Sequence, residues 1–156
     1  MHAMKKEANH HIELDIGDVS NCACATLRKT SRAITQSYDD ALRPFDLRTT
    51  QFTLLATLDK TGDVPLTKLA KNLGMDRTTL TRNLKPLIRR QMVMIENETD
   101  QRVRNVSLTN VGKQAVEQAL PHWQSIQHEI SQKLGSERWT DLLNDLNAMA
   151  SVIEEP

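Results

Sequence analysis

Apolar residues recur every three or four positions through most of the chain, which is the spacing of amphipathic helices. A stripe that starts at Val19 predicts a long first helix ending near Pro44. Similar stripes predict further helices at about residues 49–60, 110–133 and 137–153. With only five glycines, five prolines and 3% aromatic residues, a fold of many short strands is disfavoured. The chain is therefore expected to be mainly α.

Residues 66–90, LTKLAKNLGMDRTTLTRNLKPLIRR, have the pattern of two short helices joined by a tight turn. Gly74 occupies a position where a left-handed residue would end the first helix, and Asp76 is placed to cap the second. One face of the second helix is apolar, and the opposite face has no carboxylate after the cap. Solvated faces usually mix charge signs, so this face favours nucleic-acid binding. The candidate DNA-binding residues in this helix are Arg77, Thr78, Thr79, Thr81, Arg82, Lys85 and Arg89.

The segment after residue 92 alternates between apolar and polar positions. Val93 and Ile95 alternate with polar neighbours, as do Val106 and Leu108, and a polar turn at 97–101 separates the two runs. This pattern predicts a β-hairpin. A hairpin directly after a helix-turn-helix is a wing. The short segment DVPL before the two helices is expected to form one edge-strand pairing.

The 20 basic and 20 acidic residues cancel overall, but they are unevenly distributed. Residues 66–119 carry ten basic and five acidic side chains, and residues 120–156 carry two and six. Because exposed charges are screened beyond about 8–10 Å, the basic middle can still bind phosphate locally. No apolar run of 18 residues and no signal-peptide-like core is found, so a cytoplasmic protein without a membrane partner is expected, with reduced thiols.

The order of the elements predicts three regions. Residues 1–17 are expected to be a flexible N-terminal arm, residues 47–109 a winged helix-turn-helix domain, and residues 18–46 and 110–156 a helical dimerisation region. The long terminal helices cannot bury their apolar stripes against so small a central module. The simplest partner for them is a second copy of the chain, which predicts a homodimer.

Three segments resemble the MarR family of bacterial transcription regulators. They are RPFDLRTTQFTLLATL at 43–58, LTKLAKNLGMDRTTLTRNLKPLIRRQMV at 66–93 and DQRVRNVSLTNVGKQAV at 100–116. The resemblance spans roughly residues 19–153. It implies an obligate homodimer, usually a repressor of genes for drug efflux, aromatic catabolism or stress response. It also implies that small phenolic or other lipophilic ligands bind between the dimer helices and the winged module and weaken DNA binding.

In such a dimer each recognition helix enters a major groove of a pseudo-palindromic operator, with half-sites about 10 base pairs apart. Arg77 and Arg82 are expected to reach guanine edges. Thr78 and Thr81 are expected to contact phosphate or thymine methyl groups.

Cations further along the helix and in the wing are expected to contact the DNA backbone or the minor groove. Lys85, Arg89 and Arg90 are expected to hold phosphate. The resemblance places Arg102 in the minor groove, where the potential attracts a guanidinium, with Asp100 fixing its geometry by a salt bridge. Arg104, two residues further on, is a candidate for the same surface.

Cys22 and Cys24 allow two interpretations. About 200° apart on a helix, they cannot share one metal or form a local disulfide. One subgroup of the family senses organic hydroperoxides through a cysteine in the first helix, assisted by two tyrosines of the other subunit. Tyr38 follows Cys24 at that subgroup's spacing, but the second tyrosine would fall at Thr49. The alternatives are a redox switch at Cys24, with Cys22 nearby, or two small buried packing residues.

Other functional classes find little support. The cysteines have no adjacent histidine, no Gly-rich phosphate loop occurs, and the His, Glu and Cys residues lack a metal-binding spacing. No enzyme activity, metal or cofactor is therefore expected. A winged-helix protein-protein adaptor would need an acidic or apolar exposed face. The sequence thus predicts a homodimeric, sequence-specific DNA-binding regulator, a repressor released by a small lipophilic or phenolic ligand, with a Cys24 redox switch as the alternative.

Overall fold

The computed structural model describes residues 17–97 and 104–154, which belong to two units. The first unit ends at Ile34 and the second begins at Thr35. In the first, a 3-10 helix η1, Val19–Asn21, precedes helix α1, Ala23–Leu42, whose second half belongs to the second unit. The expected single helix from Val19 is therefore interrupted. Cys22 has an extended backbone (φ −62°, ψ 115°) and lies between the two helices.

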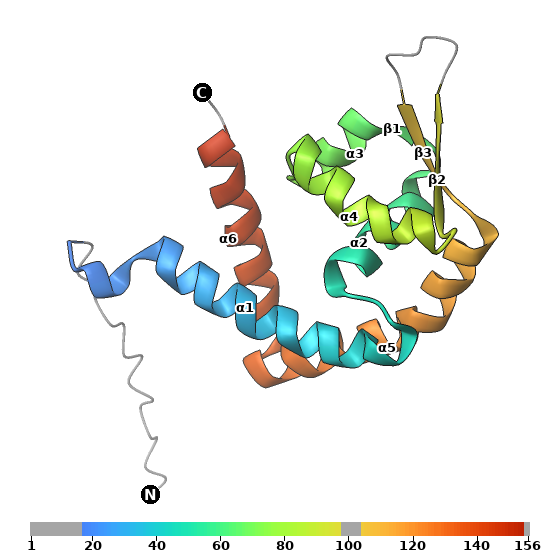
Figure 1. The fold of residues 1–156 in the computed structure, drawn as a ribbon. Coiled ribbons are helices and arrows are strands. Elements are labelled where there is room, and N and C mark those ends of the chain that lie inside the picture. The colour runs from blue at the N-terminus through green and yellow to red at the C-terminus, as the bar shows by residue number, and fades with distance from the viewer. Residues whose placement is uncertain (1–16, 98–103, 155–156) are drawn as a thin grey trace, which may run out of the picture. The chain divides into compact units, whose positions relative to one another are not determined.

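The second unit holds the remaining helices and all described strands (Figure 1). Each predicted helix is present, with ends within a few residues of the expected ones. The elements are a 3-10 helix η2, Arg43–Phe45; α2, Thr49–Thr61; β1, Val64–Pro65; α3, Leu66–Asn72; α4, Arg77–Arg89; β2, Val93–Asn97; β3, Arg104–Leu108; α5, Asn110–Leu134; and α6, Ser136–Glu154.

The three strands form an antiparallel sheet in the order β1-β3-β2. Val106 of the central strand pairs with Val64 of β1 and with Ile95 of β2. The predicted edge pairing and hairpin are therefore both confirmed. The expected tip residues Asp100 and Arg102 lie outside the described residues.

The hydrophobic core lies in the winged module and is built around α2 and α4. Leu54 and Leu55 of α2 and Leu80 and Leu84 of α4 are completely buried. The first half of α5 closes this core from the other side through buried residues such as Val116. The fold is mainly α with a three-stranded wing, as the sequence predicts.

Helices α1 and α6 both contact α5. Tyr38, near the end of α1, donates a hydrogen bond to Gln127 of α5, and its ring lies 6.2 Å from that of Trp123. α6 packs against α5, but no residue of its described part is fully buried. Among the described residues, no helix combines the length and apolarity needed to cross a membrane.

Candidate nucleic-acid interface

The start of α4 is fixed by the turn that follows α3. Gly74 has φ 59°, a left-handed conformation that favours glycine, and the Met75 N–H donates to the Ala70 carbonyl at 2.9 Å. Asp76 then adopts an extended backbone and caps α4 by accepting from the Thr79 N–H at 2.8 Å and the Thr79 hydroxyl at 2.7 Å. The sequence-based prediction of both turn residues is confirmed.

The cap also determines the charge at this helix end. Hydrogen bonds from the Thr79 side chain and N–H, helped by the charge of Arg82, lower the pKa of Asp76 below its ordinary value. Asp76 is therefore ionised at neutral pH, where its negative charge stabilises the helix N-terminus. The Thr79 hydroxyl proton is used in this cap, so a DNA contact by Thr79 would use its methyl group or its oxygen lone pair.

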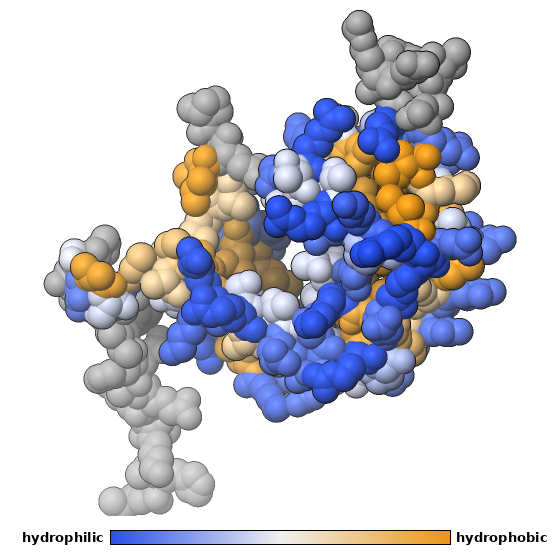
Figure 2. Space-filling model, in the orientation of Figure 1, coloured by the Kyte–Doolittle hydropathy of each residue, from blue (hydrophilic) through white to orange (hydrophobic). Residues whose placement is uncertain are grey.

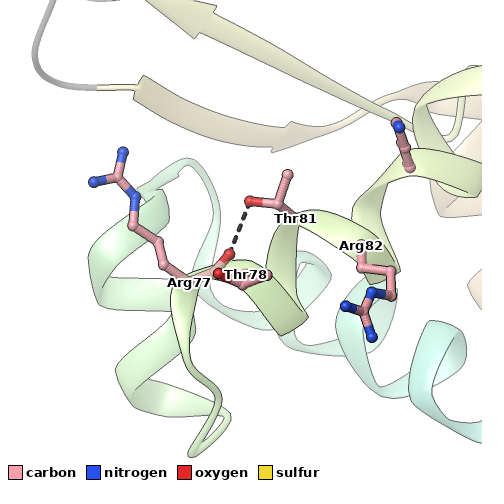
Figure 3. A pocket seen from close by; sticks show the side chains of 5 residues that line it. Arg77, Thr78, Thr81 and Arg82 are labelled. Carbon is pink, nitrogen blue, oxygen red and sulfur yellow. Dashed lines mark hydrogen bonds between the residues drawn. The ribbon is translucent and has the colours of Figure 1, made fainter.

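The remaining surface of α4 divides into a buried and a basic face. Leu80, Leu84 and Leu87 point into the core. The opposite face borders a shallow depression of about 430 Å³. It is lined by Arg77, Thr78, Thr81, Arg82 and Lys85. In Figure 3 the two arginines lie on either side of the two threonines.

The depression offers cations and hydrogen-bonding groups, with differences among the threonines. The Thr81 hydroxyl donates back to the Arg77 carbonyl at 2.8 Å, which leaves its methyl group and its lone pairs for a partner (Figure 3). Thr78 is exposed, and its hydroxyl makes no bond to another described residue. This surface can thus combine charge, hydrogen bonds and methyl contacts within two turns of one helix.

The cations of α4 form no salt bridge within the described part of the chain. None of the salt bridges formed there includes Arg77, Arg82, Lys85 or Arg89, all of which are exposed. The surface over α4 is accordingly hydrophilic in Figure 2. Arg104, the first residue of β3, is exposed and pairs across the hairpin with Asn97, at the end of the two strands that adjoins the turn.

Arg90, the first residue after α4, differs from its neighbour Arg89. Its Nη1 donates to the Asp46 carbonyl at 2.5 Å, and its Nη2 donates to the Phe45 carbonyl at 3.4 Å. The sequence-based interpretation grouped Arg90 with the phosphate contacts, whereas in the structure its guanidinium donates to two carbonyls of the protein. Local spacing could not have indicated these bonds, since the partners lie more than 40 residues apart.

Sequence reasoning also missed Asp39. Its carboxylate accepts from the Thr49 N–H and hydroxyl, each at 2.7 Å, and from Arg48 Nη1 at 3.0 Å. Burial raises the pKa of Asp39, but these hydrogen bonds and the Arg48 charge outweigh burial and leave it below its ordinary value. Asp39 of α1 thereby caps the start of α2.

Cys22 and Cys24 belong to the first unit, and both thiols are exposed and free of disulfides. The packing interpretation required buried side chains, which the single chain does not provide. Within residues 17–97 and 104–154, no cluster of His, Cys, Asp and Glu is suited to a metal ion.

Comparison with known proteins identifies this architecture. The model of the MarR family matches residues 47–103. A transcriptional regulator of Bacillus subtilis, YhbI, is 30% identical over 110 residues, which are 67% of this chain and 71% of the relative. The chain belongs to the MarR family. As a MarR-family member it is a DNA-binding transcriptional regulator of the winged helix-turn-helix type and not an enzyme.

Other relatives extend the similarity beyond the matched segment. The structure of the M. tuberculosis transcriptional regulator MosR in complex with DNA has a TM-score of 0.79 at 35% identity, covering 85% of this MarR-family chain and 96% of MosR. The Staphylococcus aureus transcriptional regulator SarZ is 28% identical over 140 residues, 85% of this chain and 89% of SarZ. Both alignments extend well outside the winged module.

Proposed function

We propose that this MarR-family chain is a homodimeric repressor that binds a pseudo-palindromic operator with one α4 helix in each of two successive major grooves. The observation that carries the proposal is the α4 surface on which Arg77, Arg82, Lys85 and Arg89 lack acidic partners in the described structure. Half to two-thirds of protein–DNA hydrogen bonds go to phosphate and sugar, so such a face is suited to a polyanion. The DNA complex of the relative MosR supports the same partner.

Within this interface the position of each side chain suggests its role. Arg77 and Arg82, near the start of α4, would contact guanine edges, and Thr78 a phosphate or a thymine methyl. Lys85 and Arg89, on the second half of the helix, would contact phosphate. In the wing, Arg104 would be a further DNA contact, and for Asp100 and Arg102 we retain the minor-groove role implied by the family.

The dimer is supported by apolar side chains that the single chain leaves in water. In α6, Leu142 and Leu143 are 37% and 39% exposed, and Val152 and Ile153 are more than 70% exposed. Apolar side chains gathered on one helix mark an interaction surface. Sedimentation velocity should give a dimer for the wild type. Leu143→Asp should shift it toward monomer, and a dimer unaffected by this charge would exclude Leu143 from the interface.

A small apolar cavity supports release by a lipophilic or phenolic ligand. It lies between α2 and α5, measures about 290 Å³ and includes Phe52, Trp123 and Lys60 in its lining. The Phe52 and Trp123 rings stack at 5.9 Å between centroids. Its volume is close to the lower end for small-molecule pockets, and Lys60 could pair with a phenolate or carboxylate.

DNA binding is the first test. Fluorescence anisotropy with duplexes from the intergenic region upstream of the gene should give saturable binding. Arg82→Ala should weaken it at least about fivefold, because the loss of even one bidentate base contact costs about 1–3 kcal/mol. Arg138→Ala, which removes one exposed cation from α6, is the matched control and should leave binding unchanged. Absence of binding by the wild type would favour a protein-binding adaptor.

A thiol-switched repressor is the second candidate function. The exposure of Cys22 and Cys24 favours it, because an oxidant can reach an exposed thiol. Cys24 is the proposed sensor residue, and its removal should make DNA binding insensitive to an organic hydroperoxide.

A further inference from the structure

The connection between α1 and α2 is held by hydrogen bonds from two directions. From α1, Asp39 accepts from the Thr49 N–H and hydroxyl and from Arg48, the N-cap residue of α2. Arg48 is bonded a second time, because its N–H donates to Gln51 Oε1 at 3.0 Å. The start of α2 is therefore fixed to α1 by side-chain bonds that fall outside the regular helix ladder.

From the opposite direction, Arg90 reaches the same connection from the end of α4. Besides its bonds to the carbonyls of Asp46 and Phe45, its Nη1 lies 3.6 Å from Asp46 Oδ2. Asp46 has φ 52°, an unusual conformation for a residue other than glycine, and its N–H donates to the Arg43 carbonyl. The Asp46 carbonyl is thus part of a fixed turn. Leu47, which follows it, is only 3% exposed and anchors the turn in the core.

These hydrogen bonds matter because side chains do not fill the space between the α1–α2 connection and the end of α4. A polar cavity of about 430 Å³ is lined by Asp39, Asp46, Arg48, Pro86 and Arg90, among others. Buried leucines fix how deeply α4 lies in the core, and the Asp76 cap fixes its first turn. At its last turn, Arg90 is the side chain that hydrogen-bonds to the α1–α2 connection.

We propose that Arg90 is a positioning residue for DNA recognition. Its guanidinium holds the C-terminal end of α4 against the turn at Phe45 and Asp46, so that the cations of α4 keep one orientation without Arg90 itself contacting DNA. This inference rests on the proposed function, since it concerns the orientation of the proposed DNA-reading helix. Loss of the bonds would let α4 adopt orientations that do not bind, and the apparent dissociation constant rises as the inverse of the fraction of molecules that keep the binding orientation.

The neighbouring residue provides a matched control, because Arg89 and Arg90 have the same charge but different predicted effects. DNA affinity is measured between 50 and 200 mM salt for the wild type, Arg89→Gln and Arg90→Gln. A lost phosphate contact lowers the steepness of log K against log salt by about 0.9. Because the proposed dimer loses one such contact in each subunit, we expect the steepness to fall by about 1.8 for Arg89→Gln. For Arg90→Gln we expect a dissociation constant raised about tenfold at every salt concentration, with an unchanged slope. Arg90→Lys, which keeps one donor, should recover part of the loss.

A second measurement on the free protein separates this inference from the proposed function. Hydrogen exchange should accelerate in Arg90→Gln at residues 45–49 and at the end of α4, and stay unchanged in Arg89→Gln. A wild type that fails to bind DNA would refute the proposed function, while the exchange data would still test the Arg90 contact. Unchanged exchange, unchanged affinity or a slope reduced as in Arg89→Gln would each overturn the positioning role. A lower melting temperature with unchanged affinity would assign Arg90 to stability alone.

Discussion

Gly112, in the first turn of α5, is the position at which the smallest side-chain addition should cost most. A Cβ at this position would lie 2.2 Å from the Met92 carbonyl oxygen and 2.6 Å from Leu108 Cδ1. The carbonyl cannot move freely, because it accepts from the Thr109 N–H at 3.0 Å, while the Thr109 hydroxyl holds the preceding residue by donating to the Gln91 carbonyl at 2.6 Å. The same hydroxyl accepts from the Gly112 N–H and so caps α5. Alanine would therefore push apart the wing and the helix that follows it.

The magnitude follows from these distances. Real Cβ contacts are essentially never shorter than 3.0 Å, so the contact with the Met92 oxygen must open by at least 0.8 Å. Overpacking of this kind costs about 1–3 kcal/mol, and one weakened hydrogen bond adds about 1 kcal/mol. Alanine recovers about 1 kcal/mol through its higher helix propensity. The expected net loss is about 2 kcal/mol, which for a chain of this size lowers the melting temperature by roughly 4–8 °C.

Thermal unfolding followed by circular dichroism tests Gly112→Ala. Protein concentration must be the same for all variants, since association raises apparent stability. Gln114→Ala, at an exposed position of the same helix, is the control and should melt within about 1 °C of the wild type. A melting temperature of Gly112→Ala equal to or above that of the wild type would refute the steric argument.

Three further predictions concern the cap, the division of roles in DNA binding and the thiols. Because the pKa of Asp76 is lowered in the folded state, its ionised carboxylate stabilises the fold above the ordinary titration range of aspartate, and this stabilisation is lost as the pH falls through the lowered pKa. Asn caps a helix without titrating, so the melting temperature of Asp76→Asn should fall less than that of the wild type below about pH 4. Arg82→Ala should relax the preference at one base position, whereas Arg102→Ala should weaken binding to many sequences; equal losses on all duplexes in a binding-site library would contradict this division. If Cys24 is a switch, an organic hydroperoxide should abolish DNA binding, dithiothreitol should restore it, and DNA binding by Cys24→Ser should be unaffected by the hydroperoxide. Wild-type binding that is unaffected by the oxidant would leave release by a small ligand as the mechanism.

Features that depend on neighbouring residues could be predicted from the sequence. The turn at Gly74, the cap at Asp76 and the hairpin that follows α4 each depend on local spacing, and each occurs as expected. The break at Cys22 could not be predicted, because Val19 continues the apolar period although the backbone leaves the helix there.

Contacts between distant segments were not predictable for a different reason. Asp39 and Arg90 look like ordinary surface charges in the sequence. Arg43 follows Asp39 at a helical i+4 spacing but pairs with Asp40 in the structure, and no acidic residue stands three or four positions from Arg90. Their partners lie 10 and 44 residues away and are brought close by the packing of three helices. Only tertiary structure distinguishes Arg90 from Arg89.

This distinction explains how a chain of zero net charge can carry a DNA-binding face. Three arginines near the α1–α2 connection are paired with aspartates, namely Arg43 with Asp40, Arg48 with Asp39 and Arg90 with Asp46. Paired charges of this kind stabilise local geometry and contribute little field at a distance. The cations of α4 form no salt bridge among the described residues, and the one carboxylate whose pKa they are seen to lower is the Asp76 cap, so most of their potential extends into solvent. Charge pairing, rather than total charge, therefore separates the arginines that support the fold from those we propose to contact DNA.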